Sequence, residues 1–156
     1  MFHFLGDFYC KLDGKARLAI PSGLRQQLPD GGKGGLVVNR GFKKNLVIYT
    51  KAEWDKKVEE LSKLNEYSAR NQDFVRYFMR GATSLVPDES GRVLLSKALL
   101  DYAGIDIKES GEIVLSCQIN KIEIWERKAY DALIANEPED FAALAEEVMG
   151  GRRHDE

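Results

Sequence analysis

Two acid–base pairs with the same spacing are the residues of this sequence best suited to chemistry. Asp13 lies four residues before Arg17, and Asp88 lies four residues before Arg92. A carboxylate at this spacing can pair with the guanidinium, whose planar fork of N–H donors also matches the oxygens of a phosphate. Each pair can therefore form an internal ion pair that only fixes a turn, or it can direct an arginine toward an anionic partner.

The surroundings of the two pairs differ in charge. The turn before Arg92 contains Glu89 and no additional base, whereas Arg17 has three bases close to it in the sequence: Lys11, Lys15 and Arg25. Phosphate binding depends on such clusters of bases. The sequence therefore favours phosphate contact for Arg17 and leaves both alternatives open for Arg92.

Both pairs belong to a repeat that runs through the chain. Residues 12–25, LDGKARLAIPSGLR, align with residues 87–100, PDESGRVLLSKALL, at an offset of 75, and the match resumes further on at an offset of 76. An internal repeat predicts that the chain is built from two similar structural units, whatever the roles of individual residues. We expect two related copies that share one core. The first copy and its following helices span residues 1–82, and the second copy and its C-terminal helices span residues 83–150. Residues 151–156 are expected to form a frayed tail.

The elements of each copy follow from local patterns. The expected order is strand, turn, strand, short helix, strand, turn, strand and helix, with the turn at 13–16 read as part of a hairpin. Thr50 and Glu53 form a capping box at the start of a helix, and Glu126 and Ala129 replace them in the second copy. Two further helices are expected, one ending near Gly81 and one opening at Pro138.

The two copies differ at the turn before the arginine. The second copy has Gly91 there, whereas the first has Ala16 and places Gly14 directly after Asp13. If this position requires a positive φ, Ala16 is strained by about 1 kcal/mol or more. Otherwise, the turn shifts toward Gly14.

Composition bounds the class of protein. The 156 residues are 44% hydrophobic and 31% charged, which is typical of a soluble globular chain. The longest apolar stretches are too short to span a membrane, and the acidic residues near the start do not fit a signal peptide, so we expect a cytoplasmic protein. Cys10 and Cys117 stand alone with only two histidines in the chain, which favours core thiols over a zinc site or a disulfide scaffold.

Charge is distributed unevenly along the chain. Residues 1–50 have eight bases and three acids, a net charge of +5, whereas residues 126–156 have four bases and nine acids, a net charge of −5. This gradient suggests a basic functional end and an acidic far end, although chance scatter is the alternative. The roles of three more sets of residues remain open. Arg40, Lys43 and Lys44 are either solvated or bind DNA, and the aromatic residues Trp54, Phe74, Tyr77 and Phe78 belong to the core or to a subunit interface. The apolar stripe at 141–148 either packs within the chain or covers a neighbouring subunit.

The doubled D-x-x-x-R pattern and several phrases in the same order resemble the MraZ family of bacterial transcriptional regulators, two-copy relatives of AbrB-like DNA-binding domains. These phrases are Met1-Phe2, RLAIP at 17–21, GLVV at 35–38, FVRYFMRGA at 74–82 and IEIW at 122–125. The resemblance implies an α+β, mainly β fold, in which two repeats form one pseudo-symmetric swapped-hairpin barrel with flanking helices.

The resemblance also implies a function. Its members assemble into closed homo-oligomeric rings and bind short repeated DNA sites upstream of the division and cell-wall genes, including their own gene, which implies association with the nucleoid. The implied DNA-facing residues are Asp13 and Arg17, together with Asp88 and Arg92. From the charges of the two turns, we expect the first copy to bind DNA and the second to be mainly architectural.

Other classes of function have less support in the sequence. No nucleophile is accompanied by a base, no phosphate-binding G-x-x-x-x-G-K-[ST] is present, and no residues cluster with metal-ligand spacing. We therefore expect no catalytic residue, cofactor or metal. The remaining alternative is a protein-interaction or antitoxin-like scaffold that uses the acidic helical C-terminal half without specific DNA binding.

Overall fold

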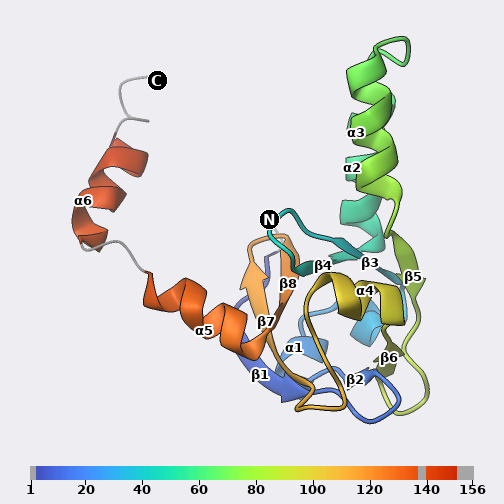
Figure 1. Cartoon of the computed structure of the whole chain (residues 1–156), viewed down its shortest axis with the longest axis vertical. Coiled ribbons are helices and arrows are strands. Elements are labelled where there is room, and N and C mark those ends of the chain that lie inside the picture. Colours follow the sequence, from blue (N-terminus) through green and yellow to red (C-terminus); the bar gives the residue numbers. More distant parts are fainter. Residues whose placement is uncertain (1–2, 137–139, 151–156) are drawn as a thin grey trace.

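The computed structural model describes residues 3–136 and 140–150, which combine antiparallel strands with flanking helices (Figure 1). The strands are β1 (Asp7–Lys11), β2 (Arg17–Ala19), β3 (Leu36–Arg40), β4 (Leu46–Thr50), β5 (Thr83–Leu85), β6 (Arg92–Leu94), β7 (Glu112–Gln118) and β8 (Lys121–Glu126). The helices are α1 (Ser22–Arg25), η1 (Pro29–Gly32), α2 (Lys51–Ser62), α3 (Ala69–Met79), α4 (Lys97–Tyr102), α5 (Arg127–Ala135), α6 (Phe141–Ala145) and η2 (Glu146–Gly150). None of the described helices is long and apolar enough to cross a membrane.

The two copies of the repeat exchange strands. One sheet has six strands in the order β1-β7-β8-β4-β3-β5, and β2 pairs with β6 in a separate two-stranded ribbon. The counterparts in the two copies are β1 and β5, β3 and β7, and β4 and β8. If each strand is replaced by its counterpart, the same strand order is read from the opposite edge of the sheet. The first strand of each copy therefore pairs with the other copy, and the chain has a pseudo-twofold axis between β4 and β8.

This exchange corrects two expectations from the sequence. β1 and β2 do not pair with each other, because β1 pairs with β7 and β2 with β6, so residues 13–16 form a turn between two sheets and not the loop of a local hairpin. The expected closed barrel is also not found among the described residues. β1 and β5 remain the two edges of the large sheet, because the turns redirect the following strands into the ribbon.

One core cluster joins both copies. Alternating residues of the strands face the ribbon, where Leu18 and Val93 are fully buried against the sheet. The opposite face carries two smaller clusters, one containing Tyr49 and Trp54 and one containing Trp125 and Tyr130. Cys10 and Cys117 pack against the main cluster, and burial raises the pKa of both thiols to about 11, in agreement with their expected role as core thiols.

Both copies have a polar cap at the helix that follows their last strand. Thr50 accepts a hydrogen bond from the backbone N–H of Glu53, as the capping box predicts. Glu126 caps the corresponding helix of the second copy, because its carboxylate accepts hydrogen bonds from the backbone N–H groups of Lys128 and Ala129 at 3.0 and 2.9 Å. The second copy therefore lacks the capping box, as expected, but still has a polar cap, because the longer glutamate side chain reaches the first N–H groups of its own helix.

The helices project from two sides of the sheet. α2 and α3 form an antiparallel pair that rises at one end of the molecule, while α5 and α6 extend from the opposite side (Figure 1). α3 begins at Ala69, capped by Ser68, and ends at Met79, close to the expected end near Gly81. The expected helix start at Pro138 and the expected frayed tail at 151–156 lie outside the described residues.

Candidate nucleic-acid interface

The ribbon brings the two repeated arginines onto one exposed surface. In its register Arg17 lies opposite Leu94, and Ala19 lies opposite Arg92, with Leu18 and Val93 between them. Successive side chains of a strand point to opposite faces. Since Leu18 and Val93 face the core, Arg17 and Arg92 share the outer face with Ala19 and Leu94.

The first turn holds Arg17 by a network centred on Asp13. The Asp13 carboxylate accepts the backbone N–H groups of Lys15 and Arg17 through Oδ1, both at 2.9 Å. Its Oδ2 accepts the Nε–H of Arg17 at 2.7 Å. The internal ion pair is therefore present, and it uses only one edge of the guanidinium. The terminal nitrogens Nη1 and Nη2 have no described hydrogen-bond or ion-pair partner.

The second turn repeats this geometry with a looser ion pair. Asp88 Oδ1 accepts the backbone N–H groups of Ser90 and Arg92 at 2.8 and 3.0 Å. Arg92 Nε lies 3.3 Å from Asp88 Oδ2 without forming an aligned hydrogen bond. The ion-pair alternative is thus present in both copies, and it fixes the direction of Arg17 more firmly than that of Arg92.

Hydrogen bonds to the ionised carboxylates lower the pKa of Asp13 and of Asp88. The largest cause is the backbone N–H of Arg17 for Asp13 and the backbone N–H of Arg92 for Asp88. We expect both carboxyl groups to titrate below about 3.9, the usual value for aspartate, in an NMR titration of the side-chain carbons. Because the folded pKa is lower than the unfolded one, the turns contribute stability above the unfolded value, and this stability is lost as the pH falls through the folded value. Midpoints at or above the usual value would contradict the described turns.

The turns require a left-handed residue directly before each arginine. Ala16 has φ 62° and Gly91 has φ 76°, while Gly14 is not among the residues with positive φ. The turn has therefore not shifted toward Gly14, and Ala16 carries the strain. Only glycine adopts this conformation without a steric cost.

We expect Gly91→Ala to lower the free energy of unfolding by about 1–2 kcal/mol, the cost of a Cβ in the left-handed region. The new Cβ would also overlap the guanidinium of Arg25, which must move. Ala16→Gly is the matched control. It relieves similar strain but loses a buried methyl group worth about 0.8 kcal/mol and gains chain freedom when unfolded, so its net change should be small. Chemical denaturation measures both, and equal effects of opposite sign would contradict this balance.

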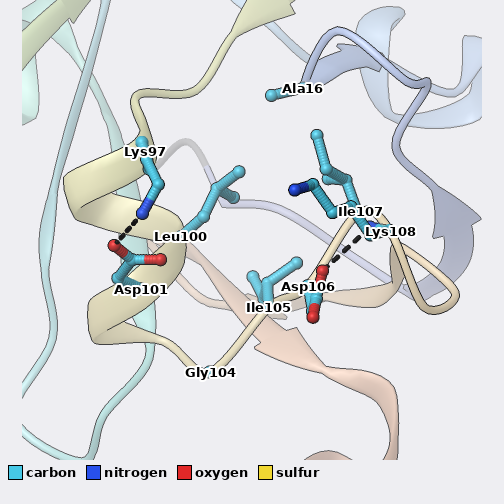
Figure 2. Close-up of a pocket in the computed structure, with 9 residues that line it drawn as sticks. All are labelled: Ala16, Lys97, Leu100, Asp101, Gly104, Ile105, Asp106, Ile107 and Lys108. Atoms are coloured by element: carbon cyan, nitrogen blue, oxygen red, sulfur yellow. Dashed lines mark hydrogen bonds and ion pairs between the residues drawn. The ribbon is translucent and has the colours of Figure 1, made fainter.

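Each turn lies beside a helix of the other copy. Figure 2 shows Ala16 facing a pocket beside α4, where Leu100 and Lys97 also line the wall. Lys97 is paired with Asp101 at 2.9 Å in the same helix. In the second copy Gly91 lies against Arg25 of α1, the residue that aligns with Leu100 at the offset of 75. The sequence did not single out Lys97, whose position becomes apparent only from the strand exchange.

The structure separates the remaining predicted bases. Lys15 is exposed in the first turn, and Arg25 is half-buried beside the second turn, so Arg25 adds charge to the opposite copy. Lys11 is exposed at the end of β1, opposite Glu112 in the large sheet, and so is not part of the ribbon. No described ion pair involves Lys11, Lys15 or Arg25.

Comparison with known proteins then assigns the family. Residues 3–76 and 78–151 match, as two successive copies, the sequence model of a family described as "MraZ protein, putative antitoxin-like". The chain belongs to the MraZ family. Its two matched segments correspond to the repeat and meet at Tyr77, within α3 of the MraZ-family chain.

Curated relatives support the same assignment over nearly the full chain. The transcriptional regulator MraZ of Christiangramia forsetii is 39% identical over 96% of this chain and 95% of its own length. Proteins with the same name from Flavobacterium psychrophilum and Cytophaga hutchinsonii are 39% and 32% identical, over 97% and 96% of this chain and 95% and 96% of their own lengths. All three relatives are named as regulators of transcription, and their similarity confirms the family that the sequence of this chain indicates.

Proposed function

We propose that this chain is a sequence-specific DNA-binding regulator of transcription whose β2–β6 ribbon enters the major groove. The observation that carries the proposal is the placement of Arg17 and Arg92 on one outer face of a two-stranded ribbon. The major groove of B-DNA accepts a two-stranded β-ribbon, and arginine recognises guanine there through two parallel hydrogen bonds. The cross-copy pairing of β1, β2, β5 and β6 is consistent with the swapped-hairpin arrangement of AbrB-like domains.

Each group on the ribbon has a chemical role in this proposal. Asp13 and Asp88 hold one edge of the guanidinium groups, so that the terminal nitrogens donate to base edges. Ala19 and Leu94, which lie opposite the two arginines on the same outer face, offer apolar contact to thymine methyl groups. Phosphate contacts come from the bases outside the Asp–Arg pairs, Lys15 and Arg25 next to the ribbon and Lys11 at the neighbouring sheet edge.

Assembly compensates for the low charge of one subunit. A chain with a net charge of −2 and a small basic surface binds DNA weakly by itself. Several ribbons on one closed homo-oligomeric ring would bind repeated sites with a high effective concentration. We propose that these repeats lie upstream of the division and cell-wall genes, including the gene for this chain, and that the protein works in the cytoplasm on the nucleoid.

A second candidate function is an interaction or antitoxin-like scaffold. It is favoured by the exposed apolar residues of the C-terminal helices, among them Leu133, Phe141 and Val148. The two functions differ in their dependence on DNA sequence, because a scaffold has no preference among DNA molecules.

The experiment is a fluorescence anisotropy titration with DNA from upstream of the gene and with scrambled DNA, across a series of salt concentrations. We expect a preference for the upstream DNA, with the logarithm of the binding constant falling linearly as the logarithm of the salt concentration rises. Equal weak binding to both DNAs would overturn the proposal and support the scaffold.

A further inference from the structure

A basic and aromatic groove lies at the base of α3, away from the ribbon. It is formed by the turn between β3 and β4, by α3 and by the end of α4. Its lining contains three bases and five aromatic rings but no acidic residue: Arg40, Gly41, Phe42, Lys44, Phe74, Tyr77, Phe78, Arg80 and Tyr102. A surface of this composition favours a ligand with both negative charge and apolar groups.

Two of the three bases of this groove lie over aromatic rings. The Arg40 guanidinium lies 5.8 Å from the ring centre of Tyr77 and 5.0 Å from that of Tyr102, and its Nη2 donates to the Tyr77 carbonyl at 3.0 Å. Lys44 Nζ lies 4.7 Å from the ring centre of Tyr102. No described carboxylate pairs with Arg40, Lys44 or Arg80. The positive charges of Arg40 and Lys44 are therefore fixed in place, and no carboxylate among the described residues neutralises the groove.

Two aromatic side chains beside these bases are exposed. Trp54 and Phe78 stack at 5.9 Å between ring centres and form the packed part of the α2–α3 pair. Phe74 and Tyr77, on the same helix, are 46% and 68% exposed. Within the aromatic set that the sequence assigned to a core or a subunit interface, Trp54 and Phe78 are thus packed together, whereas Phe74 and Tyr77 are exposed beside the groove.

The segment formed by α6 and η2 has the complementary composition. Phe141, Leu144 and Val148 are spaced by three and four residues, and all three are exposed, Phe141 at 75% and Val148 at 62%. The same segment carries Glu146 and Glu147, follows Asp140, and contains no lysine or arginine. We call residues 140–150 the acidic helix.

The repeat shows that the acidic helix lacks a cover that its counterpart has. In the first copy, α3 folds back along α2 (Figure 1). Phe78 of α3 stacks on Trp54 of α2. In the second copy, α6 extends away from the sheet, on the side opposite to the α2–α3 pair (Figure 1). Because the groove and the acidic helix lie at opposite ends of one subunit, a contact between them joins two subunits head to tail.

We propose that the acidic helix of one copy docks into the basic groove of the next copy. This inference rests on the proposed ring, for which it names the contact surfaces. Phe141 and Val148 would cover Phe74 and Tyr77, while the glutamates would face Arg40, Lys44 and Arg80. A head-to-tail contact of this kind repeats until the rotation closes a ring, and it leaves the β2–β6 ribbon free.

Two double variants of the full chain test the contact. F141D/V148D removes the docking side and F74D/Y77D removes the groove side, so each variant alone should sediment as a monomer in analytical ultracentrifugation. An equimolar mixture retains one intact groove and one intact acidic helix, and it should form a 1:1 heterodimer and no larger species. Tyr67→Asp, at an exposed aromatic residue between α2 and α3, is the matched control and should assemble like the wild type.

Further measurements separate a lost contact from a lost fold. Circular dichroism verifies that each variant is folded. E146K/E147K changes only exposed charges and should also weaken assembly, so it tests the contact even where an aspartate variant does not fold. A monomeric wild type, variants that assemble normally, or a mixture that does not pair would each overturn the contact. Binding to DNA with a single site, measured on the monomeric variants, should persist; its absence in the wild type as well would overturn the proposed function instead.

Discussion

Arg17→Ala is expected to lower the affinity for the upstream DNA by about 5- to 150-fold per bound subunit. This range corresponds to the roughly 1–3 kcal/mol of discrimination that a bidentate arginine contact with a base provides. The terminal nitrogens of Arg17 are available for that contact because Asp13 binds only Nε. When several subunits of a ring bind at once, the loss of affinity at each subunit multiplies. DNA with repeated sites should therefore show a larger effect of the substitution than DNA with a single site.

Two further substitutions make the Arg17 experiment specific. Arg92→Ala should cause a smaller loss, because Glu89 lies in its turn and its ion pair is looser. Lys15→Ala should weaken binding to upstream and scrambled DNA alike and lower the salt slope by about 1, as expected for a phosphate contact. Equal losses in Arg17→Ala and Arg92→Ala, with both proteins folded, would reject a dominant first copy.

Leu115→Ala is expected to lower the free energy of unfolding by about 2–5 kcal/mol, the range for deleting a buried leucine side chain. Leu115 is fully buried in β7, where it lies between Phe8 of the first copy and Ile124 of the second. Since both copies meet at this residue, thermal unfolding should remain a single transition at a lower temperature.

The control for the core is Val86→Ala, at a side chain that is largely exposed. It should change the stability by less than about 0.5 kcal/mol. Two separate transitions, of which Leu115→Ala shifts only one, would contradict a core that both copies share.

Local patterns predicted most of the elements but not their partners. The order of strands and short helices follows from alternating and helical spacing, and the repeat shows that the two turns are equivalent. Pairing of β1 with β7, and of β2 with β6, joins residues about 75 to 110 positions apart, which local periodicity does not encode. For this reason local patterns predict a hairpin around residues 13–16, where the structure has a turn between two sheets.

The candidate site shows the same limit. The Asp–Arg pairs could be predicted because their members are four residues apart and form ion pairs within one turn. The position of Arg25 beside Gly91, and of Lys97 near Ala16, depends on the exchange of strands between copies. The cap formed by Glu126 was missed because serine, threonine and aspartate are the usual residues at that position.

The most direct test of the central claim is the specificity ratio of R17A/R92A, measured as the affinity for upstream DNA divided by the affinity for scrambled DNA. If the outer face of the β2–β6 ribbon reads the bases, the wild type prefers the upstream DNA and the double variant, still folded and assembled, binds both DNAs weakly and equally. If the double variant keeps the wild-type ratio, the ribbon does not recognise the sequence, and the interface lies elsewhere on the protein.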